Sequence, residues 1–128
     1  GSDLRIGNKN LKYGYGYGGP CFPRDNRAFA LYAGDVNINA VISKASDEAN
    51  QLHLQYQVEE FMKNNDQSKQ IVFSRLSYKT GTTIIEESQK LALAVELAGK
   101  GYRILIQDDQ EVLKQIQSIY GDLFKYQE

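Results

Sequence analysis

The stretch QIVFSRLS, residues 70–77, decides the fold of this chain because its apolar residues predict a buried strand. A helix is predicted over residues 86–100, with Gly101 as its stop. Residues 103–107 predict the next strand, residues 111–119 predict the next helix, and residues 122–126 begin a third strand. Strands that alternate with helices in this order predict an α/β fold with a parallel sheet.

A long amphipathic segment precedes this half of the chain, over residues 37–63. Its apolar residues recur at helical spacing and predict one long helix with an apolar face made of Ile38, Val41, Ile42, Ala45, Ala49, Leu52 and Tyr56. Such a helix extends for about 40 Å at about 1.5 Å per residue, so a domain this small cannot cover its whole apolar face. Because two-fold dimers are the commonest protein assemblies, we expect a second copy of the chain to cover it. The polar run over residues 64–68 marks the boundary with the sheet.

The only cysteine, Cys21, lies between a glycine-rich loop and a short helix. This helix, predicted over residues 23–33, opens on a proline and ends before Gly34. Helix N-termini and nearby cations lower the pKa of a thiol, so this position and the nearby Arg24 and Arg27 favour a reactive Cys21. The alternative is that Cys21 is a small buried hydrophobic residue, as a free cysteine usually is.

The composition argues against several classes of protein. Fifteen basic and sixteen acidic residues give a formal net charge of −1, which is not the basic footprint of a nucleic-acid-binding protein. No stretch approaches the roughly 20 apolar residues of a membrane span, and the N-terminus lacks the apolar segment of a secretory signal. A single cysteine fits a reducing compartment, so we expect a cytoplasmic protein. Because His53 is the only histidine, we expect no His/Cys metal site.

The stretch from Gly14 to Gly19 satisfies the pattern G-x-G-x-x-G, with tyrosines alternating with glycines. A dinucleotide-binding fingerprint also needs a preceding strand and a helix that opens directly at the last glycine. Here no strand precedes the glycines, and Pro20 intervenes before any helix. We therefore interpret the segment as a shaped loop whose glycines let the backbone approach a ligand closely.

A second candidate site follows the strand at residues 70–77. Ligands of open α/β sheets bind at the carboxyl ends of strands, which makes Lys79 a candidate phosphate contact. The alternative is a capped turn with a solvent-exposed lysine. Asp108 and Asp109 end the next strand, where a carboxylate often binds a ribose hydroxyl, although Asp109 could equally cap the following helix.

Two runs together give a resemblance to a known family. The run RIGNKNLK at residues 5–12, followed by GYGGPCFPRD at residues 16–25, closely resembles the active-site segment of UDP-glucose 6-dehydrogenases. The later run SYKTGT at residues 77–82 resembles the first turn of that family's UDP-binding domain. The resemblance implies that residues 1–66 form the active-site loop and the central helical dimerisation domain. It also implies that residues 67–128 form part of a Rossmann-like UDP-binding domain.

The resemblance implies an NAD-dependent oxidation of UDP-glucose to UDP-glucuronate in two steps, through a thiohemiacetal and a thioester on the cysteine. Cys21 corresponds to that nucleophile, and Asp25 corresponds to the carboxylate that handles protons around the hydrolytic water. Arg5, Lys12 and Lys79 correspond to substrate contacts, with Arg5 reaching across a homodimer interface. Arg24 lies where a lysine usually meets a cofactor phosphate. The sugar-binding backbone corresponds to the glycine loop of Tyr13, Gly14, Tyr15, Gly16, Tyr17, Gly18 and Gly19.

The chain also departs from the family pattern. The family's N-terminal NAD-binding domain is missing and its UDP-binding domain is cut short, so we expect a piece of such an enzyme that is inactive by itself. Ile84 and Glu86 stand where the family commonly has aspartate and arginine, which puts some nucleotide contacts in doubt. Two alternatives remain open. One is a sister enzyme for GDP-mannose or a UDP-N-acetylhexosamine, and the other is a non-catalytic helical dimerisation module.

Overall fold

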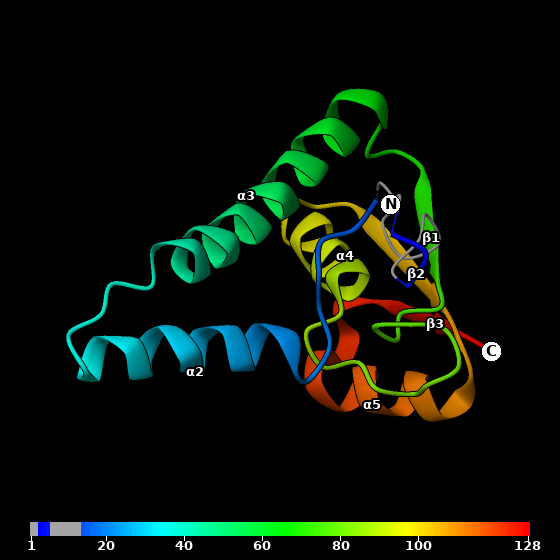
Figure 1. Cartoon of the computed structure of the whole chain (residues 1–128). Coiled ribbons are helices and arrows are strands. Elements are labelled where there is room, and N and C mark those ends of the chain that lie inside the picture. Colours follow the sequence, from blue (N-terminus) through cyan, green and yellow to red (C-terminus); the bar gives the residue numbers. More distant parts are fainter. Residues whose placement is uncertain (1–2, 6–13) are drawn as a thin grey trace.

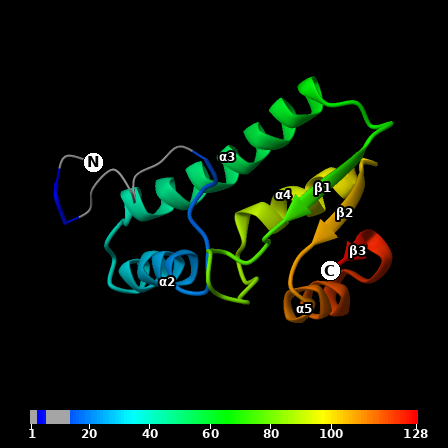
Figure 2. The same ribbon diagram turned by 90° about the vertical axis from the view of Figure 1, so that its right-hand side faces the viewer.

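The computed structural model describes residues 3–5 and 14–128, and within them it has four α-helices and a three-stranded parallel sheet (Figure 1). This arrangement confirms the predicted α/β fold. A hairpin of two helices precedes the sheet (Figure 2). The elements are α2 (Phe22–Asp35), α3 (Val41–Asn64), β1 (Gln70–Ser74), α4 (Gln89–Gly99), β2 (Arg103–Gln107), α5 (Gln110–Tyr120), the 3₁₀ turn η1 (Gly121–Leu123) and β3 (Lys125–Gln127).

The three strands run parallel in the order β1-β2-β3, so β2 is central. Phe73 pairs with Ile106, and both are buried on the face of the sheet that also packs against α4 and α5 in one hydrophobic core. Val72, the neighbour of Phe73 in β1, points to the opposite face and is 52% exposed. Both crossover helices therefore cover the same face, and the loops that follow β1 and β2 meet at one edge of the sheet.

Helix α4 begins three residues later than the sequence predicts. Ser88 occupies the N-cap position, where its hydroxyl accepts a hydrogen bond from the N–H of Leu91 at 3.3 Å. The preceding Glu87 has φ of 51°, which is incompatible with a helix that includes it. The predicted stop is confirmed, because Gly101 has φ of 92° directly after the C-cap residue Lys100.

The prediction that Gly34 ends the first helix is wrong. Gly34 lies inside α2, which continues to Asp35, and Asn37 takes the left-handed conformation with φ of 59° instead. Asparagine tolerates this conformation better than most residues other than glycine, so it can serve the turn. Because this turn uses residues 36–40, α3 begins at Val41 rather than at residue 37.

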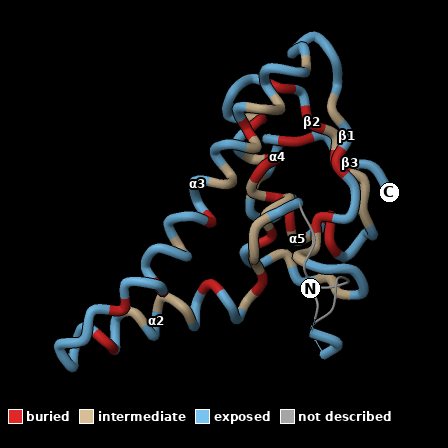
Figure 3. The backbone as a smooth tube through the Cα atoms, turned by 45° about the horizontal axis from the view of Figure 1, so that its top comes forward, coloured by how far each residue is buried: buried red, intermediate tan, exposed pale blue. Residues whose placement is uncertain are grey.

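In helix α3 most residues of the half that pairs with α2 are exposed (Figure 3). The predicted apolar residues Ile42, Leu52 and Tyr56 are between 54% and 80% exposed. The side that meets α2 is polar, since the hydroxyl of Ser43 donates to Asn26 Oδ1 at 2.7 Å and Asn26 Nδ2 donates to the Ser43 carbonyl at 2.9 Å. Within the described residues the apolar face is thus left uncovered, as the sequence predicts.

The C-terminal half of α3 packs on the sheet domain. Val58 is buried in the common core, and the ring of Phe61 meets the ring of Tyr102 edge to face with 5.7 Å between centroids. The Tyr102 hydroxyl donates a 2.8 Å hydrogen bond to the carbonyl of Asn65, just after the helix ends. These contacts fix the direction of α3 and with it the position of the helical hairpin relative to the sheet.

Candidate functional site

Cys21 lies at the N-cap position of α2 and is exposed. The helix begins at Phe22, so Pro23 is its second residue rather than its first, and the proline ring is buried. The N–H of Asp25 donates to the Cys21 carbonyl at 2.8 Å, which begins the first helical turn. The alternative of a buried structural cysteine does not hold, and the thiol is accessible to a ligand or reagent.

The first turn of α2 also holds a surface ion pair. Arg24 Nε lies 2.8 Å from Asp25 Oδ1, and both side chains are about two-thirds exposed, at 66% and 63%. The hydrogen bond to Asp25 is the main cause of the raised pKa of the Arg24 guanidinium. Asp25, the carboxylate predicted to handle protons, is therefore one turn from Cys21 and forms an ion pair with its neighbour Arg24.

Arg27, the other cation near Cys21, links three segments that are distant in sequence. Its Nε lies 2.9 Å from Asp47 Oδ1 on α3, and its Nη1 lies 2.8 Å from Glu87 Oε1 before α4. The hydrogen bond to Glu87 is the main cause of the raised pKa of Arg27. Both cations that the sequence places near the thiol are thus paired with carboxylates, and Arg27 holds the start of α2 against the sheet domain.

Other parts of the chain pack tightly against the glycine loop. A Cβ atom added to Gly18 would lie 2.1 Å from the carbonyl oxygen of Glu87, and one added to Gly19 would lie 2.4 Å from the ring of Tyr78. A Cβ atom on Gly16 would lie 2.1 Å from the side chain of Asn50. These glycines are required because the loop passes close to α3 and to the segment before α4.

Two side chains of α3 hold the loop through its carbonyl groups. Asn50 Nδ2 donates to the Tyr17 carbonyl at 2.8 Å, and His53 Nε2 lies 2.6 Å from the Gly14 carbonyl. Burial raises the pKa of the Tyr17 hydroxyl, with a smaller contribution from the charge of Asp47. Sequence reasoning missed the role of Asn50, because a single amide on a helix carries no recognisable signal.

The glycine loop and the lysine turn together enclose a cavity of about 250 Å³. The backbone of the turn is closed by a hydrogen bond from the Tyr78 N–H to the Ile84 carbonyl at 2.9 Å. Lys79 is exposed at the rim, with Nζ 5.3 Å from the centroid of the Tyr78 ring. Two segments about 60 residues apart, which the resemblance assigns to the same ligand, are therefore neighbours. The wall includes Tyr15, Gly16, Gly18, Ser77, Lys79, Thr80, Gln89 and Lys90.

A second cavity of about 380 Å³ lies at the carboxyl ends of β1 and β2, between residues 80–83 and the two aspartates. Asp108 Oδ2 accepts a hydrogen bond from the Leu76 N–H at 2.6 Å, and its Oδ1 accepts one from the Asp109 N–H at 2.9 Å. Asp109 is the N-cap residue of α5, but its side chain makes no capping hydrogen bond. Asp108 thus holds the loop after β1 in place, a role that its position in the sequence does not reveal.

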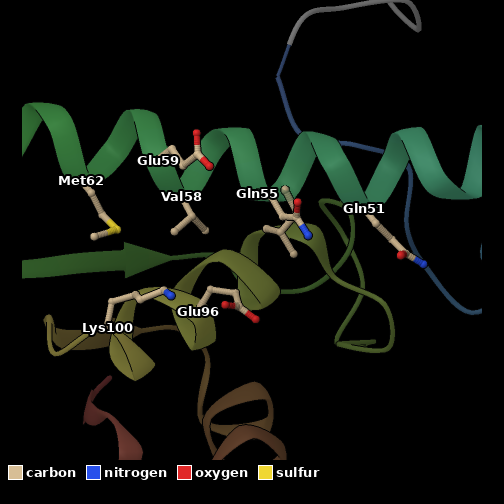
Figure 4. A pocket seen from close by; sticks show the side chains of 8 residues that line it. Gln51, Gln55, Val58, Glu59, Met62, Glu96 and Lys100 are labelled. Atoms are coloured by element: carbon tan, nitrogen blue, oxygen red, sulfur yellow. The ribbon is translucent and has the colours of Figure 1, made fainter.

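The remaining predicted residues and a groove between α3 and α4 lie elsewhere. Arg5 is exposed and pairs with Asp3 at 2.7 Å, whereas Lys12 and Tyr13 lie outside the described residues. A groove of about 550 Å³ separates α3 from α4, with Val58, Met62 and Glu96 in its wall, and it contains none of the predicted site residues (Figure 4).

In the described part of the chain, no helix is long and apolar enough to cross a membrane. No cluster of ligating side chains there could hold a metal ion.

Comparisons with known proteins show that this chain is similar to nucleotide-sugar dehydrogenases. Residues 1–52 match the model of the UDP-glucose/GDP-mannose dehydrogenase family, central domain. The chain is 33% identical over 110 residues to the UDP-glucose 6-dehydrogenase YwqF of Bacillus subtilis, covering 84% of this chain and 25% of that protein. It is 30% identical over 106 residues to a GDP-mannose 6-dehydrogenase of Pseudomonas putida, covering 83% of this chain and 24% of that protein.

Two solved structures of nucleotide-sugar dehydrogenases are also similar to this chain. A UDP-glucose dehydrogenase from the archaeon Pyrobaculum islandicum superposes with a TM-score of 0.84 and 28% sequence identity, covering 99% of this chain and 30% of that one. A GDP-mannose dehydrogenase from Pseudomonas aeruginosa has the same fold over 98% of this chain and 31% of its own, with a TM-score of 0.76 and 24% identity. The chain thus spans about a quarter of the length of the curated relatives that it matches.

Proposed function

Because this chain belongs to the UDP-glucose/GDP-mannose dehydrogenase family, we propose that it supplies the thiol and the sugar-nucleotide contacts for the NAD-dependent oxidation of UDP-glucose to UDP-glucuronate. The observation that carries this proposal is the cavity between the glycine loop and the lysine turn. Cys21 does not line this cavity, but it is exposed and follows Gly19 by two residues, and in this proposal the sugar of the bound nucleotide extends along the loop to it. Neither segment could form such a site alone.

In this proposal the chain contributes a nucleophile and a base. Bound NAD would supply the hydride acceptor for both oxidations at the sugar C6 carbon, and the hydroxyl proton released in each would pass to water. The Cys21 sulfur adds to the C6 aldehyde and forms a thiohemiacetal, which the second oxidation converts to a thioester. Water then adds to the thioester carbonyl and the C–S bond breaks, which releases the carboxylate and regenerates the thiol. In this proposal Asp25, one turn from Cys21, accepts the proton of that water.

Among the described residues we assign one phosphate contact to NAD and no dinucleotide-binding loop. The exposed guanidinium of Arg24 fits a phosphate of the cofactor, and we assign it that role. The glycine loop does not fit the dinucleotide-binding pattern, because Pro20 and Cys21 separate its last glycine, Gly19, from helix α2, which begins at Phe22.

We further assign residues 1–66 to the active-site loop and central helical domain, and residues 67–128 to the UDP-binding part. The family match over residues 1–52 supports the first assignment. The turn at residues 77–83, which follows β1 at the edge where ligands of parallel sheets bind, supports the second.

Alkylation of Cys21 tests the proposed function. Cys21 is the only cysteine, so the rate of iodoacetamide labelling, followed by intact-mass spectrometry, reports on this thiol alone. UDP-glucose at about ten times its dissociation constant is expected to slow the labelling about tenfold, because about one site in ten then remains free. UDP is expected to protect less, since it lacks the hexose that approaches the sulfur.

Two further measurements test whether the protection of Cys21 is specific. Lys79→Ala is expected to raise the UDP-glucose concentration needed for protection without changing the labelling rate of the free protein. GDP-mannose tests the sister activity, and protection by it alone would transfer the proposal to that substrate. If saturating concentrations of both nucleotide sugars leave the labelling rate unchanged, the proposed binding of a sugar nucleotide is wrong. The alternative of a non-catalytic dimerisation module would then be supported.

We also propose that a second copy of this chain covers the apolar face of α3. Ile42 is 80% exposed on this face, and burying a charge at an interface is costly, so Ile42→Asp is expected to weaken association by about 2 kcal/mol or more. Sedimentation velocity should show a dimer for the wild-type protein and a monomer for the variant at the same concentration. Lys69→Asp, at an exposed position outside this helix, is the control and should remain a dimer. A wild-type protein that sediments as a monomer at high concentration would contradict the proposal.

A further inference from the structure

The thiol and the nucleotide contacts of the proposed site lie on different parts of the fold. Cys21 begins α2 of the helical hairpin, whereas Lys79 lies in the turn that follows β1 of the sheet domain (Figure 1). The hairpin packs on the sheet domain through Val58 in the C-terminal half of α3, about 16 Å along that helix from Asp47, the residue that pairs with α2. A contact at this distance does not by itself fix the start of α2 relative to the lysine turn.

Arg27 of α2 provides a closer link between the two parts. Its Nε donates to the two carboxylate oxygens of Asp47 at 2.9 and 3.2 Å, and its Nη1 donates to Glu87 Oε1 at 2.8 Å. Among the ion pairs of residues 3–5 and 14–128, the pair with Glu87 is the one that joins α2 to the sheet domain. A planar guanidinium donates in fixed directions to both carboxylates at once, a geometry that the compact ammonium of lysine does not reproduce.

Glu87 extends this link to the glycine loop. Its carbonyl accepts a hydrogen bond from the Gly19 N–H at 3.3 Å, while its side chain holds Arg27. Gly19 precedes Cys21 and Arg27 follows it within about two turns of α2. One glutamate therefore holds the chain on both sides of the thiol. The backbone of Glu87 has φ of 51°, an uncommon conformation that persists only where the surrounding contacts hold it.

The exposure of Arg27 indicates that this link orients the two parts more than it stabilises them. Its side chain is 41% exposed, and ion pairs at such exposure contribute little to the free energy of folding. Reaction rates are more sensitive, because a displacement of about 1 Å between reacting groups can slow a reaction about a hundredfold. We propose that Arg27 is a positioning residue, which holds the Cys21 sulfur within reach of the C6 carbon of a sugar nucleotide bound at the lysine turn. This inference rests on the proposed function.

An affinity label tests this role on the full chain without NAD. The probe is a UDP-glucose analogue with a chloroacetamido group in place of the C6 hydroxyl, so the Cys21 sulfur forms a C–S bond and displaces chloride. Cys21 is the only cysteine, so intact-mass spectrometry gives both the half-saturating concentration of the analogue and the labelling rate of the bound complex. In the wild-type protein, labelling is expected to be saturable and about tenfold or more faster than with an equal concentration of chloroacetamide.

Two substitutions break the link from its two ends. Arg27→Gln and Glu87→Gln are each expected to slow labelling in the bound complex about tenfold, and to change the half-saturating concentration less than about twofold. Each rate is divided by the iodoacetamide rate of the same variant, which corrects for the reactivity of the thiol itself. The substitutions remove opposite charges, so an effect of charge on the thiol would change the two rates in opposite directions. The double variant is expected to be no slower than either single variant, since both remove the same link.

Two further variants serve as controls. Arg27→Lys keeps the charge but not the fixed geometry, so it should also be slowed, and it repeats the test if Arg27→Gln does not fold. Arg103→Gln, at an exposed position of β2 that does not line the cavity, should label like the wild type.

The results distinguish a failure of this inference from a failure of the proposed function. If the wild type labels rapidly and both glutamine variants label equally fast, the positioning role is wrong while the proposed function stands. The same conclusion follows if the variants change only the half-saturating concentration, if their rates change in opposite directions, or if the double variant is about a hundredfold slower. A wild-type protein that labels no faster with the analogue than with chloroacetamide would contradict the proposed function, and the positioning role with it.

Discussion

Replacing Gly18 by alanine is expected to destabilise the folded chain by about 3 kcal/mol, close to the upper end of what overpacking costs. The new Cβ atom would lie 2.1 Å from the carbonyl oxygen of Glu87, a distance that real Cβ atoms essentially never show. The obstacle is backbone and cannot rotate away. It is also fixed on both sides, because the side chain of Glu87 pairs with Arg27 and Ser88 caps α4.

Urea denaturation followed by circular dichroism measures this effect, and Gly34→Ala is its matched control. Gly34 lies inside α2 with no atom within 4 Å of an added Cβ, so the same substitution there should stabilise the chain by about 0.5–1 kcal/mol. Opposite signs for one chemical change would show that the glycine loop is held by close packing. A Gly18→Ala protein with the wild-type midpoint would mean that the loop does not pass Glu87 at this distance.

Replacing Ile116 by alanine is expected to cost about 3–4 kcal/mol, because it removes buried methyl groups and leaves a cavity in the core. Ile116 is fully buried on α5, in the cluster that also contains Ile106 of the central strand and Leu97 of α4. Domains of this size have about 5–15 kcal/mol of stability in total, so the variant loses a large share of it.

The same helix offers the control for this prediction. Ile119, one turn further along α5, is 63% exposed, and Ile119→Ala should change the free energy of unfolding by less than about 0.5 kcal/mol. Both substitutions exchange the same residue types in one helix, so differences in helix propensity cancel. Equal losses for the two variants, measured by urea denaturation, would contradict the orientation of α5 on the sheet.

Much of the fold could be predicted because its signals are local. The strand at residues 103–107 agrees with β2 at both ends, and Gly101 ends α4 as predicted, because an apolar run and a glycine stop are each read within a few residues. Helix starts were less accurate, since Ser88 and the turn at Asn37 compete with the apolar pattern around them. The exposed apolar face of α3 also follows from the sequence, which contains too few residues to cover it.

The candidate site could be predicted only in part. The sequence located Cys21 at the start of a helix and Lys79 in the turn after β1, because a proline-opened helix and a strand end are local features. It could not identify the residues that shape the site around them. Asn50 holds the carbonyl of a residue 33 positions away, and Arg27 pairs with a glutamate 60 positions away. No motif marks either residue.

The sequence by itself therefore determined the order of strands and helices, the place of the single thiol and the presence of an uncovered apolar face. The tertiary structure alone decided that the glycine loop is pressed against Glu87 and Tyr78, and that this loop and the lysine turn enclose one cavity. The physical reason is that these contacts depend on where α3 directs the hairpin relative to the sheet. That direction is set by packing between segments that are distant in sequence. The atom that excludes a side chain at Gly18 is the backbone carbonyl oxygen of Glu87. Every residue has such a carbonyl group, so the sequence cannot indicate this contact.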